Sequence, residues 1–222
     1  MSEKRENYGF DKNEGFIGNV DDFNGIIFCL REPNTNNKKA EEFWFQKVIN
    51  QREQYFQELK EKKQGNIVIS KRIATRFKNE FVGILEQLKI DETLSNIAFC
   101  NVNSEKGRNK VEKEYNVALE KADEKMEEIV ILSPKKQLRI FTCVDIYEKL
   151  KNAWNDKYDI KEEKEKGIKY LQTKTGKTVK RNRFTCQIAD KNVTVYDMYH
   201  PSRVGRYKLW EKLLHELNEN SK

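Results

Sequence analysis

With 222 residues, of which 36% are charged and 37% hydrophobic, the chain is long enough for one domain with a substantial core. Its formal net charge of +7 fits a polyanionic partner, although lysine-rich chains without such a partner share this excess. No run approaches the roughly 20 apolar residues that cross a bilayer, and no hydrophobic signal region follows the charged start, so we expect a cytoplasmic protein without a membrane partner.

Four strongly apolar runs indicate the strands of the core. A polar, extended lead-in (residues 1–24) comes before them. The predicted strands are residues 25–30, 97–100, 138–144 and 193–198. Each cysteine lies in or beside a β-like run, and the four are far apart without a CxxC pair, so we expect reduced, buried thiols and neither a metal site nor a cofactor.

Segments with apolar residues at helical spacing separate these strands. The predicted helices are residues 40–63, 70–88, 109–132, 146–154 and 207–217. A charged insertion, 156–190, interrupts the pattern, and within it Tyr170 to Ile188 predicts a β-hairpin around Thr175-Gly176. This hairpin is basic, with Lys177, Lys180 and Arg181 among its residues, and it is equally consistent with a phosphate-binding or a merely solvated surface.

The alternation of strands and long helices predicts an α/β fold in a single domain of residues 1–222. We expect three layers, with a central, mainly parallel four-stranded sheet flanked by helices. The basic hairpin is an insertion into this arrangement.

Three polar segments follow predicted strands: Arg31-Glu32-Pro33-Asn34, Asn101-Val102-Asn103 and His200-Pro201-Ser202. Ligands of open α/β sheets bind beyond the carboxyl ends of the strands, so these segments can converge on one site. A carboxylate, an amide and an imidazole together can orient water, recognise a planar ligand edge and stabilise an oxyanion. The alternative is that the segments are polar connections without chemistry, since a single histidine at a strand end is more often structural.

Two of these segments resemble motifs of the uracil-DNA glycosylase superfamily. Phe28-Cys29-Leu30-Arg31-Glu32-Pro33-Asn34 resembles the proline-containing motif at the end of that family's first strand. His200-Pro201-Ser202 is similar to the motif that follows its last strand. The resemblance implies a parallel sheet flanked by helices and a monomeric, monofunctional DNA glycosylase. Such an enzyme flips uracil or another altered base out of single- or double-stranded DNA and needs no metal.

The resemblance also implies roles for individual residues. Glu32, or Asn34 beside it, orients water toward the sugar C1′, and His200 stabilises negative charge on the departing base. The residues that the resemblance implies for holding the flipped base are Asn101, Asn103 and Phe45. Val204 fills the vacated stack. The implied DNA contacts are Ser202, Arg203, Arg206, Lys177, Lys180 and Arg181.

A second function from a different class stays open. Leu30-Arg31 stands where the family has a glycine followed by a variable residue, so the chain also fits a non-catalytic nucleic-acid-binding relative with the same fold. A different α/β hydrolase or a nucleotide-binding enzyme is disfavoured, because the sequence has neither a Walker A loop nor a GxSxG elbow.

Overall fold

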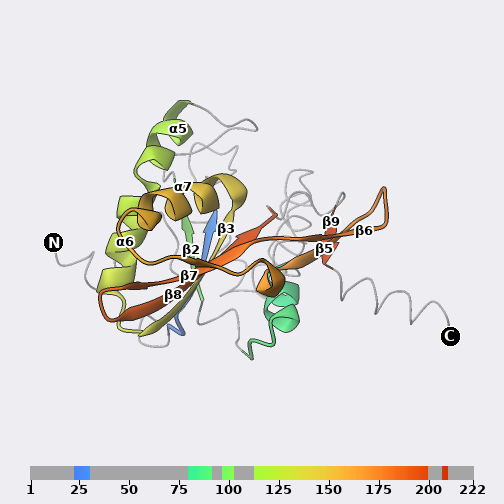
Figure 1. Ribbon diagram of the computed structural model, residues 1–222, viewed down its shortest axis with the longest axis horizontal. Coiled ribbons are helices and arrows are strands. Elements are labelled where there is room, and N and C mark those ends of the chain that lie inside the picture. The colour runs from blue at the N-terminus through green and yellow to red at the C-terminus, as the bar shows by residue number, and fades with distance from the viewer. Residues whose placement is uncertain (1–22, 31–79, 92–96, 103–112, 200–206, 210–222) are drawn as a thin grey trace, which may run out of the picture.

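The structure is a computed structural model that describes residues 23–30, 80–91, 97–102, 113–199 and 207–209. A six-stranded sheet forms the centre of these residues, and a second sheet of three strands extends beside it (Figure 1). The predicted helix at 40–63 lies outside the described residues, as do most of the helices predicted at 70–88 and 207–217.

Four strands of the large sheet are parallel. In spatial order they are β2 (Ala98–Asn101), β1 (Ile26–Leu30), β3 (Gln137–Cys143) and β8 (Lys191–Met198). All five residues of β1 are buried, because helices or other packed segments cover both faces of the sheet. The four apolar runs are therefore confirmed as strands, with ends that differ from the prediction by one or two residues.

The chain enters β1 through Gly25, which has a φ of +87°. A Cβ at this position would lie 2.4 Å from the carbonyl oxygen of Gln137 on β3. The Gly25 carbonyl in turn accepts a hydrogen bond of 2.9 Å from the backbone N–H of Arg139. Glycine is required here because only a residue without a side chain fits both the left-handed backbone and the close approach of β3.

Two further strands make the large sheet mixed. β7 (Arg183–Ile188) pairs antiparallel with β8, and the short β4 (Lys161–Glu162) pairs antiparallel with β7. The prediction of an α/β fold with a sheet and helices is confirmed, but the sheet has six strands instead of four. The sequence prediction placed 183–188 in the basic hairpin; alternate residues of this segment are instead buried against the helices, which draws it into the large sheet.

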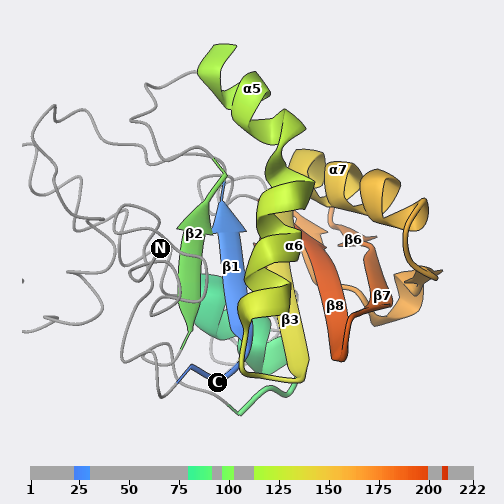
Figure 2. The same ribbon diagram turned by 90° about the vertical axis from the view of Figure 1, so that its left-hand side faces the viewer.

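Helices lie along one face of the large sheet (Figure 2). α6 (Ala122–Leu132) and α7 (Val144–Asn155) cover this face, and α5 (Lys113–Glu120) precedes α6 and projects beyond the sheet. α6 and α7 bury Met126, Ile129, Leu150 and Trp154 at helical spacing against alternate residues of the strands. The single helix predicted over 109–132 is divided at Lys121 in the structure.

The opposite face is packed by the helical residues 80–87, which confirm part of the helix predicted at 70–88. Phe81 meets Phe28 of β1 with ring centroids 4.2 Å apart, and Phe28 stacks on Phe141 of β3 at 4.7 Å. Phe141 stacks in turn on Tyr196 of β8 at 4.8 Å. This row of aromatic rings runs across three neighbouring parallel strands and holds them in register.

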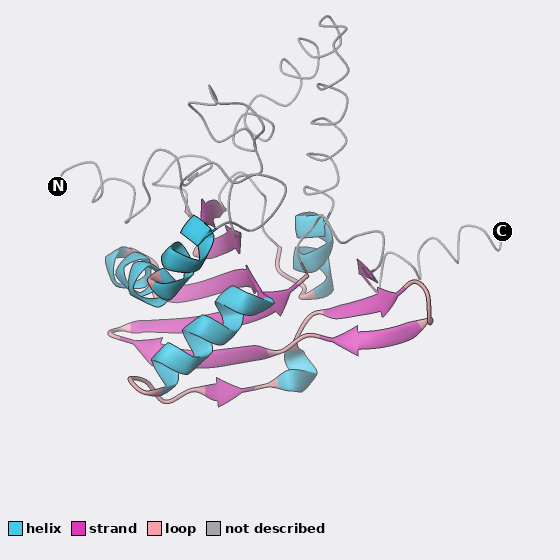
Figure 3. Ribbon diagram, turned by 90° about the horizontal axis from the view of Figure 1, so that it is seen from above, coloured by secondary structure: helices cyan, strands magenta, loops and turns pink. Residues whose placement is uncertain are grey.

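The small sheet contains β5 (Lys169–Gln172), β6 (Lys177–Lys180) and β9 (Tyr207–Leu209), with β5 in the middle (Figures 1 and 3). Gln87 connects it to the helical residues 80–87, because its side chain both donates to and accepts from the backbone of Lys169. The helix predicted from Tyr207 is wrong for 207–209, because these residues form backbone pairs with β5. Tertiary pairing of this kind overrides local propensity.

Within the described ranges, no helix is long and apolar enough to cross a membrane.

Candidate functional site

The parallel strands β1, β2, β3 and β8 all end at the same side of the large sheet, here called the carboxyl edge. Leu30 at the end of β1 pairs with Asn101 at the end of β2, and the Leu30 carbonyl accepts a hydrogen bond of 2.9 Å from the N–H of Val102. Cys143 ends β3 beside Met198 at the end of β8. Because neighbouring strands lie about 4.8 Å apart, the ends of β1 and β8 are about 10 Å apart, with β3 between them.

The three polar segments singled out in the sequence all begin at this edge. Arg31 follows Leu30 directly, Asn101 is itself the last residue of β2, and His200 comes two residues after Met198. The order of the strands also reverses at β1, because β2 and β3 lie on opposite sides of it. Such a reversal of strand order is the usual location of a ligand site in an open α/β sheet.

Most of the predicted site residues lie outside the described part of the chain. These are Glu32, Asn34, Phe45, Asn103, His200, Ser202, Arg203, Val204 and Arg206. Of Asn101 only the backbone is described, at the end of β2. The structure shows only where the strands before these segments end. The roles of these residues stay predictions.

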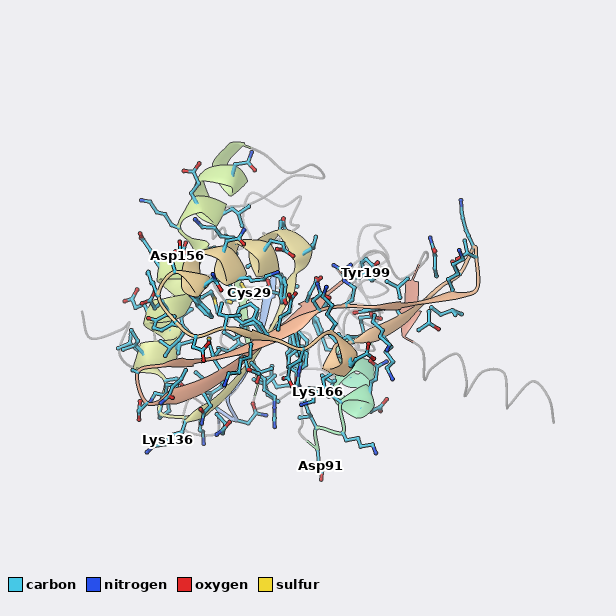
Figure 4. The ribbon with its side chains drawn as sticks, viewed as in Figure 1. Cys29, Asp91, Lys136, Asp156, Lys166 and Tyr199 are labelled. Carbon is cyan, nitrogen blue, oxygen red and sulfur yellow. The ribbon has the colours of Figure 1, made fainter. Side chains whose placement is uncertain are left out.

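Beneath the edge, one row of register partners crosses the four parallel strands: Cys100, Cys29, Thr142 and Asp197. All four residues are buried, and Cys29 lies within the large sheet in Figure 4. In the described part of the chain, Thr142 Oγ1 and Asp197 Oδ1 have no hydrogen-bond partner. Buried polar atoms are nearly always hydrogen-bonded, so this pair of oxygens is suited to bind water or a polar ligand group.

Asp197 makes an ion pair with Arg181, which lies between β6 and β7. The Asp197 side chain is 3% exposed and that of Arg181 17%. Burial raises the pKa of the Asp197 carboxyl to about 7, although the positive charge and hydrogen bond of Arg181 act in the opposite direction. Asp197 can therefore change its charge near neutral pH.

The Arg181 guanidinium also lies over the ring of Tyr199, 4.6 Å from its centroid. Tyr199 follows the end of β8 and is labelled in Figure 4 on the side of the small sheet. Its ring meets that of Tyr170 on β5 edge-on, with centroids 4.9 Å apart. The predicted role of Arg181 as a DNA contact does not fit this position, because its guanidinium is largely buried and engaged inside the protein.

A second buried arginine lies two residues further along the chain. Arg183 on β7 pairs with Glu163 at 2.5 Å and donates a hydrogen bond of 3.1 Å to the hydroxyl of Tyr196. The two arginines thus have different partners, although both are mostly buried and only one residue separates them in the chain.

The basic hairpin of the structure consists of β5, β6 and the turn between them, residues 169–180. Its exposed lysines are Lys169, Lys174, Lys177 and Lys180. Lys180 makes an ion pair with Glu165, and residues 169–180 contain no acidic side chain. Lys177 and Lys180 therefore stand on an exposed basic surface, as a contact to a polyanion requires.

Sequence reasoning did not single out Asp197, Thr142 or Tyr199. A signal for Asp197 was present, because an aspartate within the apolar run Val193–Met198 must either end the strand or find a buried partner. Nothing in the sequence indicated that this partner is Arg181. Within the described ranges, no group of three or more His, Cys, Asp or Glu side chains could hold a metal ion.

Comparison of the chain with models of protein families, with curated proteins and with solved structures finds no match in any of the three. A function is therefore indicated only by the resemblance of the two motifs and by the geometry of the carboxyl edge.

Proposed function

We propose that this protein is a hydrolase of N-glycosyl bonds that acts on a nucleotide flipped out of a nucleic acid. More particularly, we propose a monofunctional DNA glycosylase that removes uracil or another altered base. The proposal combines the resemblance of the segments around Glu32 and His200 with the position of the strand ends from which both segments leave.

The single observation that carries the proposal is the shared carboxyl edge of β1, β2 and β8. Asn101 ends β2 directly beside Leu30 at the end of β1, and Met198 ends β8, which lies two strands from β1 and three from β2 on that edge. Segments that begin there within about 14 Å of one another can surround one nucleobase, whereas segments from opposite edges cannot.

In the proposed reaction, developing charge is stabilised at two positions, the sugar and the departing base. Glu32, with Asn34 beside it, orients a water molecule toward the sugar C1′ and stabilises the positive charge that develops on the sugar. His200 donates a hydrogen bond to the departing base, which leaves as an anion. Each group acts on charge that develops only in the transition state, so each contributes to the rate more than to substrate binding.

Binding of the altered nucleotide uses other groups. Asn101 and Asn103 hydrogen-bond the edge of the base, Phe45 stacks on it, and Val204 occupies the space that it leaves in the duplex. Arg203, Arg206 and Ser202 contact nearby phosphates. Lys177 and Lys180 of the basic hairpin add contacts that weaken as salt is raised, in keeping with the net charge of +7.

The test is an assay for abasic sites. The full chain is incubated with single- and double-stranded oligonucleotides that contain uracil, hypoxanthine or another altered base, and abasic sites are then cleaved with alkali. We expect strand breaks at the altered base, undiminished by EDTA. Glu32→Gln and His200→Gln should each lower the rate by about 100-fold or more, as expected for groups that act in the transition state.

Matched variants separate chemistry from folding. Glu120→Gln changes the same atoms on an exposed residue at the end of α5, and His215→Gln changes the only other histidine. Both should retain activity. DNA binding that is salt-sensitive, without abasic sites on any of these substrates, would contradict catalysis and favour the non-catalytic relative.

A further inference from the structure

The basic hairpin, residues 169–180, is anchored at its base and projects from the rest of the protein. At the base, Tyr170 is buried, and the side chain of Gln87 both donates to and accepts from the backbone of Lys169. The turn between β5 and β6 extends away from the large sheet in Figures 1 and 3. Residues 173–178 are all exposed. A large partner can therefore reach the outer half of the hairpin.

The turn between β5 and β6 is held in shape by its own hydrogen bonds. The carbonyl of Gln172 accepts from the N–H of Thr175 at 3.2 Å and from the N–H of Gly176 at 2.9 Å. The Thr175 hydroxyl donates to Gln172 Oε1 at 2.8 Å and accepts from the N–H of Lys177 at 3.3 Å. Lys174 and Lys177 thus leave from a backbone of defined shape, which limits the entropy that is lost when a partner binds.

The exposed half of the hairpin carries positive charge without negative charge. Residues 169–180 contain four lysines and no acidic residue. Lys180 makes an ion pair with Glu165. Within the described ranges, Lys174 and Lys177 make no ion pair. The charges of these two lysines are therefore available to an external polyanion.

The other exposed side chains of the hairpin distinguish between polyanions. Residues 173–178 are threonine, lysine and glycine. They provide no aromatic ring on which an unpaired base could stack, and Tyr170 at the base of the hairpin is buried. They also provide no apolar side chain to enter a membrane surface. Hydroxyl and ammonium groups are suited to the phosphates of a duplex.

The width of the hairpin and its lysines on both faces fit a groove of B-form DNA. Two paired strands lie about 4.8 Å apart. Such a ribbon enters the major groove, which is about 12 Å wide, whereas the minor groove is only about 6 Å wide. Lys169 and Lys180 are register partners on one face, and Lys177 lies with its register partner Gln172 on the other. The ribbon therefore presents positive charge to both walls of the major groove.

The hairpin begins next to the carboxyl edge. Tyr199 follows β8, and its ring meets that of Tyr170 edge-on, with centroids 4.9 Å apart. Five residues of extended chain, about 17 Å, lead from Tyr170 to the turn. A duplex that lies across the carboxyl edge can therefore continue along the hairpin.

We propose that the basic hairpin enters the major groove of B-form DNA and places Lys174 and Lys177 on its phosphates. The inference rests on the proposed function and specifies its substrate class, an altered base in double-stranded DNA. A single strand has no groove, and the major groove of duplex RNA is too deep and narrow for side chains to read. The hairpin therefore adds affinity for duplex DNA in particular.

The test is fluorescence anisotropy of the full chain with unmodified oligonucleotides of one sequence, as duplex DNA, single-stranded DNA and duplex RNA. Lys174→Gln/Lys177→Gln should weaken binding of duplex DNA about tenfold or more. It should reduce the slope of log affinity against log salt concentration by about 1.8, because two phosphate contacts are lost. Binding of the single strand and of duplex RNA should change less than about threefold, because these contacts are absent there.

Two matched variants separate the proposed contacts from general effects of charge. Lys136→Gln/Lys161→Gln removes the same charge from exposed residues of the large sheet, and Lys136 lies far from the hairpin in Figure 4. It should leave the salt dependence of duplex binding unchanged. Lys174→Arg/Lys177→Arg retains both charges and should retain duplex binding. All variants should keep the circular dichroism of the wild type, since the substituted side chains are exposed.

Several results would overturn the inference. One is unchanged duplex binding in Lys174→Gln/Lys177→Gln, which would leave the hairpin a solvated surface. Another is an equal loss for duplex DNA and single-stranded DNA, or for duplex DNA and duplex RNA. Vesicles of phosphatidylserine and phosphatidylcholine provide a further comparison. Vesicle binding that is lost in this variant while duplex binding is kept would identify a membrane as the partner.

These outcomes differ from those of the assay for abasic sites, because the oligonucleotides contain no altered base. If the wild type produces no abasic sites, the proposed function fails, and the loss of duplex binding in the variant still supports the role of the hairpin. Abasic sites that the wild type forms in single strands but not in duplexes would remove this inference alone.

Discussion

Two regions that are neighbours in the chain differ in the environment of their charged side chains. One is the basic hairpin, and the other is the contact between the two sheets, here called the Arg181 junction, which comprises residues 167–168, 181–182 and 197–199. In the junction, Arg181 is largely withdrawn from water and is paired with the buried Asp197. In the hairpin, Lys174 and Lys177 are exposed, and a polyanion can reach them. The comparison indicates that a basic residue in this segment has a fixed internal partner where the backbone is tightly packed, and is exposed to solvent where it is not.

The largest effect is expected from the tightest contact of the junction. Gly167→Ala forces a methyl group against the Arg181 carbonyl, where a Cβ would lie at 1.6 Å. We expect a loss of about 3 kcal/mol or more in the free energy of unfolding, because the backbone has to move. Urea denaturation followed by circular dichroism measures it.

The hairpin provides the matched substitution. Gly176 has a φ of +64°, but a Cβ there would meet no atom within 4 Å. Gly176→Ala should therefore lose only about 1 kcal/mol, from the left-handed backbone. Equal losses in the two variants would contradict the difference in packing between the two regions.

A smaller effect is expected in the pH dependence of stability. Burial raises the pKa of Asp197 to about 7 in the folded protein, above the value of 3.8 for an ordinary Asp side chain. The folded state therefore holds a proton that the unfolded state has lost, so this contribution to stability is complete below about pH 4 and disappears as the pH rises through 7.

Asp197→Asn should remove that pH dependence. The free energy of unfolding of the wild type, relative to the variant, should fall by on the order of 2 kcal/mol between pH 4.5 and 8. The comparison is made by urea denaturation at both pH values. A difference that stays constant, or that grows with pH, would show that Asp197 is ionised throughout this range.

The contribution of Glu127 on α6 to stability should have the opposite dependence on pH. Burial raises its pKa, but hydrogen bonds from Lys157 at 2.8 Å and from the hydroxyl of Tyr158 at 2.6 Å outweigh burial, and the pKa is lowered overall. Its contribution is present above about pH 4.5 and is lost as the pH falls through the lowered value. Glu127→Gln should lose about 1 kcal/mol at pH 7 and less at pH 3, measured by thermal unfolding.

The smallest effect concerns the hairpin alone. Lys177→Gln should leave stability unchanged and reduce the slope of log affinity against log salt concentration by about 0.9 for double-stranded DNA, if one phosphate contact is lost. Fluorescence anisotropy at several salt concentrations measures the slope. Lys161→Gln, on the exposed β4 of the large sheet, removes the same charge and should leave the slope as it is.

Local patterns in the sequence were sufficient to predict most strands of the large sheet and the helices that pack on it. The runs around Phe28, Phe141 and Val195 are apolar because both faces of these strands are covered, so they predicted buried strands with polar segments after them. The helical spacing of Met126, Ile129, Leu150 and Trp154 likewise predicted α6 and α7.

Only the tertiary structure decided how these elements are combined. The order of the strands, the pairing of β7 with β8 and the strand at 207–209 depend on backbone hydrogen bonds between distant residues, which leave no periodic pattern. The same holds for Arg181: its sequence context is that of a basic hairpin, and its partner Asp197 lies 16 residues away. Polar segments after strands can be recognised from the sequence, because the chain itself alternates there between apolar and polar residues; which of them share an edge follows from the arrangement of the strands in space.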